Sequence, residues 1–264
     1  MKKAIIALVI IALAGFTYFQ TDLFNSPGKI IANPAPEAAL ANVPLESIEM
    51  SNELWLVNGE HPIDAAKSKG ITSLSGATSR ALETWFGAAS LVNIADFFIV
   101  SGYRTRKEQE QLYNEAMDKR YVARPDTSEH QIGLAVDIAA TNVSGADLTD
   151  STEGKWLKKT AWENGFILRY PEGKEHITGV AYEPWHFRYV GVPHAYYCYK
   201  ESLTLEEYVI LLRSGYSYQM RLQGKDYWVY HTTVENGSIE VPKDLPYQVS
   251  EDNAGGYIVT VQKR

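Results

Sequence analysis

The spacing of apolar residues along the chain predicts four helices. Over residues 73–90 apolar side chains recur every three or four positions, which is the pattern of one buried helix face. Residues 105–117 are rich in Glu, Gln and Lys, and Thr105 with Glu108 three positions later forms a capping-box pattern that favours a helix start. Two further helices are expected at 155–164, ended by Gly165, and at 208–212, after a second capping-box pattern at Thr204 and Glu207.

Apolar runs between these helices predict short strands. Residues 95–100 include two Phe and end at Ser101-Gly102, so we expect a buried strand there. The runs 134–139, 166–170 and 185–190 have the same character. After residue 201 the pattern changes to short β-type runs with turn signals such as Asn236-Gly237 between them, at 226–233, 238–241, 247–250 and 257–262. This order predicts a mixed α and β domain over 46–200 and a small β-rich C-terminal appendage over 201–264.

The N-terminal segment has the layout of an export signal. Lys2 and Lys3 precede an unbroken apolar run over residues 4–16. The run is shorter than the roughly 20 residues that a membrane-spanning helix needs. Residues 1–19 are therefore predicted to be either a cleaved signal peptide or an uncleaved anchor that holds the chain at a membrane. In both cases we expect the rest of the chain to be extracytoplasmic, either membrane-anchored at its N-terminus or secreted.

Residues 20–45 have a different texture, with four prolines among Asn, Ala and Ser and little periodicity. Proline-containing stretches of this kind are typical of extended tethers. We therefore expect a linker between the N-terminal segment and the folded domain.

Composition and charge narrow the classes of function. A chain of 264 residues with 45% hydrophobic residues forms a core, which excludes disorder of the whole chain. Asp and Glu number 32 against 25 Lys and Arg, whereas a nucleic-acid binder usually carries a basic surface. We expect no nucleic-acid partner. The single cysteine, Cys198, excludes an internal disulfide and a Cys-rich zinc site.

Three segments carry residues that suggest chemistry, and the first is Ser101-Gly102-Tyr103-Arg104. Arg104 follows a predicted strand, where its planar guanidinium can be directed at a carboxylate. Gln109, one turn into the next predicted helix, is expected to lie nearby. The alternative for Arg104 is an ordinary surface or structural ion pair.

The second segment runs from Ser128 to Asp137. His130 and Asp137 are seven residues apart, an odd offset that would put them on opposite faces of one straight strand. Gly133 offers a bend between them. Asp137 stands between Val136 and Ile138, and a carboxylate in such an apolar run needs a strong partner, of which a metal is one. The alternative is a loop histidine and an aspartate held by backbone donors.

The third segment holds Glu183-Pro184-Trp185-His186 at the start of an aromatic strand. Pro184 cannot donate a hydrogen bond to a strand neighbour, so we expect Glu183 in a turn at the strand mouth, facing the same cleft as His186. The alternative is a core histidine beside a surface glutamate. Together the segments supply two imidazoles and one carboxylate, a set that binds catalytic zinc and leaves the fourth position to water. Glu183 is then left to accept that water's proton.

These residues resemble the VanY-type D-alanyl-D-alanine carboxypeptidases, a family of zinc D,D- and L,D-peptidases of the peptidoglycan. The resemblance rests on Ser128-Glu129-His130, Gly133, Ala135, Asp137 and Glu183-Pro184-Trp185-His186, with further matches at Ser101-Gly102-Tyr103-Arg104, 56–58 and His61-Pro62. It covers roughly residues 53–191. It implies an α+β fold with a small antiparallel sheet flanked by helices. It also implies Zn²⁺ bound by His130, Asp137 and His186, with Glu183 as the catalytic base.

The activity that the resemblance implies is that of a zinc metallocarboxypeptidase. Such a hydrolase removes the C-terminal D-Ala from peptidoglycan stem peptides at the cell wall. Arg104 is expected to bind the substrate's terminal carboxylate or to stabilise the developing oxyanion, and Ser128 and Gln109 to add hydrogen bonds. Two alternatives stay open. One is an L,D-carboxypeptidase acting on tetrapeptide stems. The other is a non-catalytic wall-binding protein on the same fold, against which Glu183 argues because binding alone needs no base.

Overall fold

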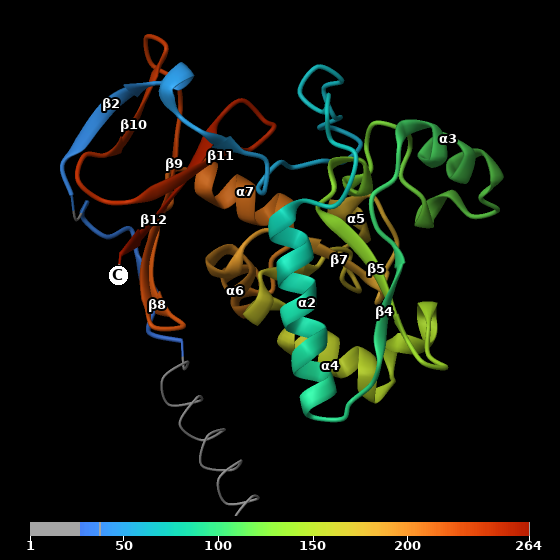
Figure 1. The fold of residues 1–264 in the computed structure, drawn as a ribbon. Coiled ribbons are helices and arrows are strands. Elements are labelled where there is room, and N and C mark those ends of the chain that lie inside the picture. Colours follow the sequence, from blue (N-terminus) through green and yellow to red (C-terminus); the bar gives the residue numbers. More distant parts are fainter. Residues whose placement is uncertain (1–26, 37, 264) are drawn as a thin grey trace, which may run out of the picture. The chain divides into compact units, whose positions relative to one another are not determined.

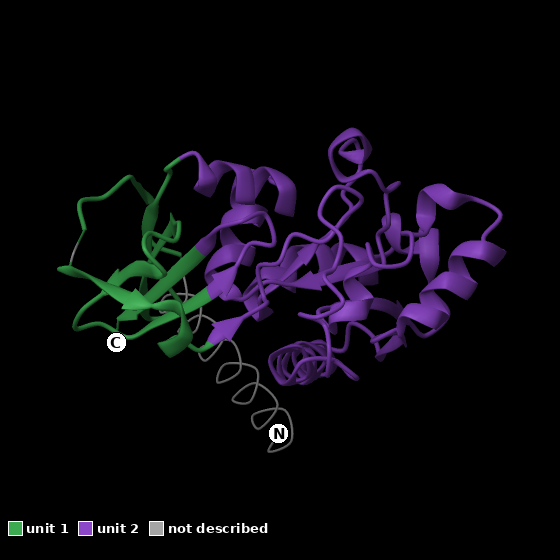
Figure 2. Ribbon diagram, turned by 90° about the horizontal axis from the view of Figure 1, so that it is seen from above, with its two compact units in different colours: residues 1–49, 215–249, 258–264 green, residues 50–214, 250–257 purple. Residues whose placement is uncertain are grey.

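The computed structural model describes residues 27–36 and 38–263, which fall into two compact units (Figure 2). Unit 1 comprises residues 1–49, 215–249 and 258–264, and unit 2 comprises residues 50–214 and 250–257. The segment 1–19, for which a signal or anchor is predicted, lies outside the described residues. In the part of the chain that is described, no helix has the length and apolarity that a membrane crossing requires.

Unit 2 is a four-stranded antiparallel sheet with helices around it. The sheet order is β4-β5-β7-β6. Its strands are β4 (Phe97–Ser101), β5 (Ala135–Ala140), β6 (Phe166–Leu168) and β7 (His186–Tyr189). The helices are α2 (Gly76–Leu91), α3 (Arg106–Glu115), α4 (Thr152–Thr160), α5 (Glu175–Thr178), α6 (Val192–Glu201) and α7 (Leu205–Arg213). Shorter elements are β3 (Met50–Ser51) and the 3₁₀ turns η2 (Lys119–Tyr121), η3 (Glu129–Ile132), η4 (Gly145–Thr149) and η5 (Ala161–Asn164). This confirms the predicted α+β class.

The helix starts follow the capping signals in the sequence. The Thr105 side chain accepts a hydrogen bond from the Glu108 N–H while the Glu108 carboxylate accepts one from the Thr105 N–H, which completes the predicted capping box of α3. The same reciprocal pair begins α7 at Thr204. Helix α2 begins three residues later than the apolar pattern predicts, because the Ser75 hydroxyl accepts the Thr78 N–H and sets the boundary there.

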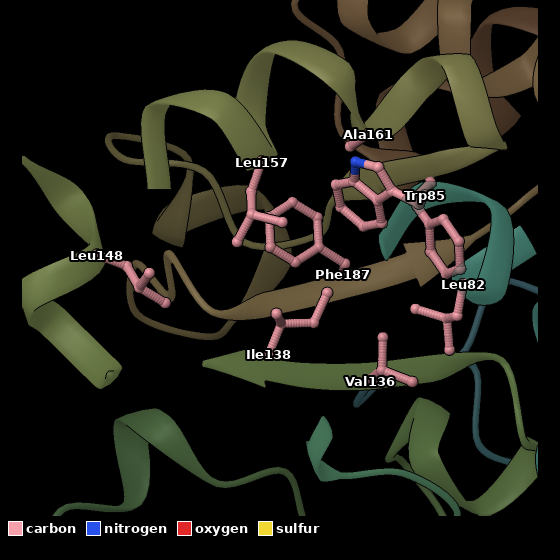
Figure 3. Packing of buried hydrophobic residues seen from close by; sticks show 9 residues of the cluster. Leu82, Trp85, Val136, Ile138, Leu148, Leu157, Ala161 and Phe187 are labelled. Atoms are coloured by element: carbon pink, nitrogen blue, oxygen red, sulfur yellow. The ribbon is translucent and has the colours of Figure 1, made fainter. Parts of the chain in front are cut away.

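One face of the sheet packs against helices and forms the main core of unit 2. Leu82 and Trp85 of α2 meet Val136 and Ile138 of β5 and Phe187 of β7 (Figure 3). Leu157 of α4 and Phe166 of β6 complete this cluster. Trp85 has no exposed surface and stacks on Phe166, with ring centroids 5.3 Å apart. Figure 1 shows α2 running along β4 and β5. The opposite face carries Asp137 of β5 and His186 and Arg188 of β7.

Strand β4 corrects one prediction. The apolar run 95–100 predicts a buried strand, but Phe98, Ile99 and Val100 are 51%, 41% and 62% exposed. The reason is topological, because β4 is an edge strand that pairs only with β5 within its sheet. A short apolar run does not reveal whether a strand will lie at the centre or at the edge of a sheet.

Unit 1 is rich in strands, as predicted for the C-terminal residues, and two of its strands lie in the segment 20–45, for which a linker is predicted. Its strands are β1 (Ile31–Ala32), β2 (Leu40–Pro44), β8 (Tyr218–Leu222), β9 (Lys225–Thr232), β10 (Ser238–Pro242), β11 (Tyr247–Glu251) and β12 (Tyr257–Lys263), with the 3₁₀ turn η1 (Leu45–Ser47). Strand β2 pairs with β10 over five residues, and β1 pairs with β8. The linker prediction is therefore wrong over these strands, because backbone groups that a tether would leave to water pair with strands about 190 residues away.

The boundary predicted at residue 201 is also corrected. Helix α7 lies beyond it and yet belongs to unit 2. Leu205, Val209 and Leu212 on one face of α7 are fully buried. The return segment 250–257 is part of the same unit, where the Leu56 N–H donates to the Asp252 carbonyl at 3.0 Å.

Candidate metal centre

The register of β5 against β7 brings two of the predicted ligands together. Asp137 and His186 are directly opposed Cα partners in this antiparallel pair. Side chains of directly opposed residues lie on the same face with their Cβ atoms about 5 Å apart. The neighbouring pair, Val136 and Phe187, faces the core instead. Alternation along the strands thus places the acid and the imidazole on the polar face of the sheet.

The third predicted ligand, His130, enters the site through a turn. It lies in η3, which ends at Gly133 with a left-handed backbone, φ +69°. A Cβ at position 133 would lie 2.3 Å from the Ser73 carbonyl oxygen, so only glycine fits there. The turn removes the odd-offset problem, because His130 precedes the bend and Asp137 lies in the strand after it. The predicted role of Gly133 as a bend is confirmed.

The three side chains form a compact donor set. Each of His130, Asp137 and His186 offers one atom, and these atoms lie within 4.8 Å of one another. His130 Nε2 is 3.4 Å from Asp137 Oδ2, and His186 Nδ1 is 3.0 Å from Asp137 Oδ1. All three residues are almost completely buried.

The imidazole hydrogen bonds leave one nitrogen of His130 free for a metal. His130 Nδ1 lies 2.6 Å from the Gly102 carbonyl oxygen, a contact that fixes the proton on Nδ1. His130 Nε2 is buried and has no hydrogen-bond partner among the described residues. A buried unprotonated nitrogen beside a carboxylate and a second imidazole is the environment that a divalent transition metal satisfies. The donor set fits zinc, which prefers imidazole and carboxylate ligands and keeps an open position in catalytic sites.

The electrostatics of the donor set reflect burial and close opposite charges. Burial lowers the pKa of His130. Burial opposes ionisation of Asp137, but the neighbouring imidazoles of His130 and His186 hold the pKa of this carboxyl well below its usual range. Burial likewise disfavours protonated His186, yet the carboxylates of Asp137 and Glu129 raise its pKa to about 9. Without a metal, the ionised Asp137 is therefore paired with a protonated His186, and metal binding displaces the proton of His186.

Glu183 lies beside the donor set but is not one of its members. It belongs to the loop before β7, where its N–H donates to the Tyr170 carbonyl at 3.1 Å. Glu183 is 4% exposed, and its Oε2 lies 3.5 Å from His186 Nδ1. Burial, reinforced by the charge of Asp137, raises the pKa of Glu183 to about 8. A carboxyl group with a raised pKa at the edge of a metal site is suited to carry a proton.

Arg104 reaches the site from the loop after β4. Its Nη2 donates to Asp137 Oδ2 at 2.6 Å, its Nε to Ser101 Oγ at 2.8 Å and its Nη1 to Gln109 Oε1 at 3.2 Å. A guanidinium has five N–H groups, so two of them keep no partner among the described residues. Arg104 therefore both fixes Asp137 and retains donors for a further anionic group.

The structure separates the two remaining predicted site residues. Ser128 lines the same cavity as the donor set, Glu183 and Arg104, a cavity of about 210 Å³. Gln109 is fully buried behind Arg104. Its Nε2 donates to the Ala123 carbonyl at 2.7 Å while its Oε1 receives Arg104. Both ends of the Gln109 amide thus have partners within the chain, and Gln109 is not among the residues that line the cavity, so its hydrogen bond to substrate stays a prediction.

Sequence reasoning missed a set of charged residues behind the donor set. Glu129, Arg169, Arg188 and Glu206 are between 0% and 5% exposed and are linked by hydrogen bonds. In the sequence, Glu129 is marked only by its place in the Ser128-Glu129-His130 motif. Arg169 and Arg188 occupy strands or strand ends between apolar residues, which is the same signal that singled out Asp137. Nothing in the local pattern marks Glu206.

Comparison with known proteins agrees with this site. The model of the family "VanY: D-alanyl-D-alanine carboxypeptidase" matches residues 72–192. A D-alanyl-D-alanine carboxypeptidase of Enterococcus faecium is 41% identical over 169 residues, 64% of this chain and 54% of that protein. The bifunctional D-Ala-D-Ala dipeptidase and carboxypeptidase VanXYC of Enterococcus gallinarum is 38% identical over 179 residues, 60% of this chain and 93% of that protein. The chain thus spans about half the length of the first relative and nearly all of the second.

A solved structure extends the likeness to the fold. The crystal structure of a mutant of the vancomycin resistance D,D-pentapeptidase VanY in complex with Zn(II) has a TM-score of 0.52 to this chain and is 37% identical. The match covers 60% of this chain and 98% of that one. The family match spans His130, Asp137, Glu183 and His186, and it spans the sheet that holds them. The chain belongs to the VanY family of D-alanyl-D-alanine carboxypeptidases.

Proposed function

We propose that this chain is a zinc-dependent D-alanyl-D-alanine carboxypeptidase that removes the terminal D-Ala from peptidoglycan stem peptides. One observation carries the proposal. The donor set of His130, Asp137 and His186 shares a cavity of about 210 Å³ with a buried glutamate, Glu183, that stays outside the set. Binding a metal requires the first three residues, whereas hydrolysis also requires the fourth.

The cation and Glu183 divide the chemistry between them. Bound zinc supplies Lewis acidity for a carbonyl oxygen and for a water molecule. Glu183 takes a proton from the attacking water at Oε2 and passes it to the nitrogen of the departing D-alanine. Its pKa of about 8 in this buried position would leave it protonated at neutral pH, but a divalent cation nearby favours the carboxylate and lowers that pKa. A raised pKa makes the carboxylate a stronger base, which favours its taking the proton from the attacking water.

Arg104 and Ser128 provide the polar wall of the cavity. Arg104 keeps one N–H on each terminal nitrogen without a partner among the described residues, and donation of these to a terminal carboxylate would distinguish a free chain end from an internal peptide bond. Ser128 lines the cavity and offers a hydroxyl to the same substrate group. Apolar contacts come from Leu112, Val122 and Trp185, which also line it. A small cavity of this kind suits a residue whose side chain is only a methyl group.

The test uses two defined peptides and control of the metal. Purified protein should release D-Ala from a stem pentapeptide ending in D-Ala-D-Ala, lose the activity with a chelator and regain it with zinc. Preferential cleavage of a tetrapeptide stem would instead assign L,D-carboxypeptidase activity. Zinc binding without turnover of either peptide would favour a wall-binding role and overturn the proposal.

Export completes the proposed role, since peptidoglycan lies outside the cytoplasm. The basic and then apolar residues of segment 1–19 support an export signal or an N-terminal anchor. Fractionation of cells into membrane, wall and medium, with N-terminal sequencing of the mature chain, distinguishes an anchor from a cleaved signal. Retention of an intact chain in the cytoplasm would contradict export.

A further inference from the structure

A buried charge network lies directly behind His186. Arg169 and Arg188 have no exposed surface, and each donates to the same oxygen, Glu129 Oε1, at 2.7 Å, Arg169 through Nε and Arg188 through Nη1. Arg169 also donates hydrogen bonds from both terminal nitrogens to the Glu206 carboxylate, at 2.6 and 2.9 Å. Two guanidinium groups therefore balance two carboxylates, and all four side chains are buried. Buried ion pairs are costly to desolvate, so their contribution to stability is a weak reason for such a network.

The network leaves one oxygen unused, and that oxygen faces the metal centre. Glu129 Oε2 is buried and has no hydrogen-bond partner among the described residues. It lies 3.7 Å from His186 Nε2, which is likewise buried without a hydrogen-bond partner there. The other nitrogen of this ring, Nδ1, lies 3.0 Å from Asp137 Oδ1 on the side of the donor set. The imidazole of His186 thus lies between the carboxylate of Glu129 on its Nε2 side and the carboxylates of Asp137 and Glu183 on its Nδ1 side.

We propose that Glu129 is the positioning residue of the metal centre, accepting the Nε2–H of His186 so that Nδ1 presents its lone pair to zinc. A carboxylate behind a metal-bound imidazole fixes the tautomer and ring orientation and raises the basicity of the ligand. The gap of 3.7 Å exceeds the usual N–H···O range by about 0.5 Å. A small tilt of the ring towards the donor set or of the carboxylate closes it. The inference rests on the zinc site of the proposed function.

The two arginines that bind Glu129 are themselves anchored by groups outside the segment that the family match covers. That match ends at residue 192 and begins at residue 72. Glu206, which fixes Arg169, lies on α7, and its Oε1 also accepts from Asn58 Nδ2 at 3.1 Å. Arg188 Nη2 donates to the carbonyls of Glu53 and Trp55 at 2.9 and 3.0 Å. The flanking segments thus hold the two arginines that aim Glu129 at His186.

The first experiment compares Glu129→Gln with Glu206→Gln. Both variants neutralise one carboxylate that pairs with Arg169, but only Glu129 contacts His186. The amide of Glu129→Gln can place its NH₂ against His186 Nε2, which favours the tautomer protonated on Nδ1 and blocks the metal side. We expect zinc affinity, measured by chelator competition at pH 7, to fall about 10- to 100-fold in Glu129→Gln. Glu206→Gln should keep zinc affinity within about threefold even if its melting temperature falls.

Equal zinc affinity in Glu129→Gln and wild type, or equal losses in both variants, would overturn the inference. Circular dichroism and thermal melts on the same samples report whether each variant is folded. A wild-type chain that bound no zinc would instead refute the proposed function, so the two failures are distinguishable.

A second measurement needs no variant. Long-range ¹H–¹⁵N correlation spectra of the zinc-loaded wild-type protein report the tautomer of each histidine ring. We expect the His186 ring to carry its proton on Nε2, with a slowly exchanging signal, and to bind the metal through Nδ1. His130 should show the opposite arrangement, with the proton on Nδ1 towards the Gly102 carbonyl. A His186 ring protonated on Nδ1 would overturn the inference whatever the fate of the variants.

Discussion

Replacing Glu183 by glutamine should abolish turnover while the metal centre and the fold survive. The change keeps the size of the side chain and removes only its ability to accept a proton. Among the residues that line the cavity, the only other carboxylate is that of Asp137, which is held by Arg104 and both imidazoles. No second base is therefore at hand to replace Glu183.

The size of the effect follows from this lack of a substitute. A positioned acid–base group contributes about 10²- to 10⁴-fold to a rate, which corresponds to about 2.7–5.4 kcal/mol of barrier. With no replacement base in the cavity, the upper half of this range is expected for kcat. Stability should change little. Glu183 has no Lys or Arg partner among the described ion pairs, and an uncharged amide avoids the cost of burying an anion.

The assay measures zinc content, kcat and KM on one preparation of Glu183→Gln. We expect one zinc per chain, a KM within a few-fold of wild type and a kcat lower by about 10³–10⁴. His186→Ala is the matched control, because it should lose zinc and activity together. A kcat within tenfold of wild type with zinc bound would refute the role of Glu183. Loss of zinc along with activity would make Glu183 a ligand rather than the base.

Three further predictions address the fold, pH and substrate. Gly133→Ala should lower both melting temperature and zinc affinity, because its Cβ would lie 2.3 Å from the Ser73 oxygen; Gly173→Ala, also at positive φ but with nothing within 4 Å, is the control for backbone strain alone. Burial lowers the pKa of His194 to about 3, so below about pH 6.5 the unfolded chain binds a proton that the folded chain does not bind. The free energy of unfolding therefore decreases as the pH is lowered. Between pH 7 and 5 the wild type should lose about 2 kcal/mol more than His194→Gln in urea unfolding, and parallel losses would refute this. Amidating the C-terminus of the substrate should lower kcat/KM about 10- to 100-fold in wild type but much less in Arg104→Ala, and an equal penalty in both would give Arg104 another role.

The sequence correctly predicts those features of the structure that depend on residues close together in the chain, such as the helix starts. The capping pairs at Thr105 and Thr204 begin helices because the hydroxyl and the carboxylate that satisfy the backbone are only three residues apart. The metal donors were predictable for a similar reason. Asp137 in an apolar strand is costly without a partner, and Gly133 marks a bend that no other residue tolerates.

Long-range pairing explains the failures. Whether the apolar run at Phe98 and Val100 becomes a central or an edge strand depends on strand order, which no window of sequence contains. The proline-rich segment pairs through β2 with β10, a partner about 200 residues away. Glu206 joins Arg169 across 37 residues of chain. In each case the stabilising partner is distant in sequence, so the local pattern gave the wrong prediction or none.

The metal centre and the hydrophobic core of unit 2 depend on one and the same register. The pairing that sets Asp137 opposite His186 also sets Val136 opposite Phe187, one pair on each face of the sheet. A slip of β5 against β7 by one residue would carry Asp137 into the core and Val136 into the polar cavity. The packing of Phe187 on Trp85, with ring centroids 5.2 Å apart, therefore helps to hold the donor atoms at their distances. Core packing on one face thus preorganises the metal site on the other.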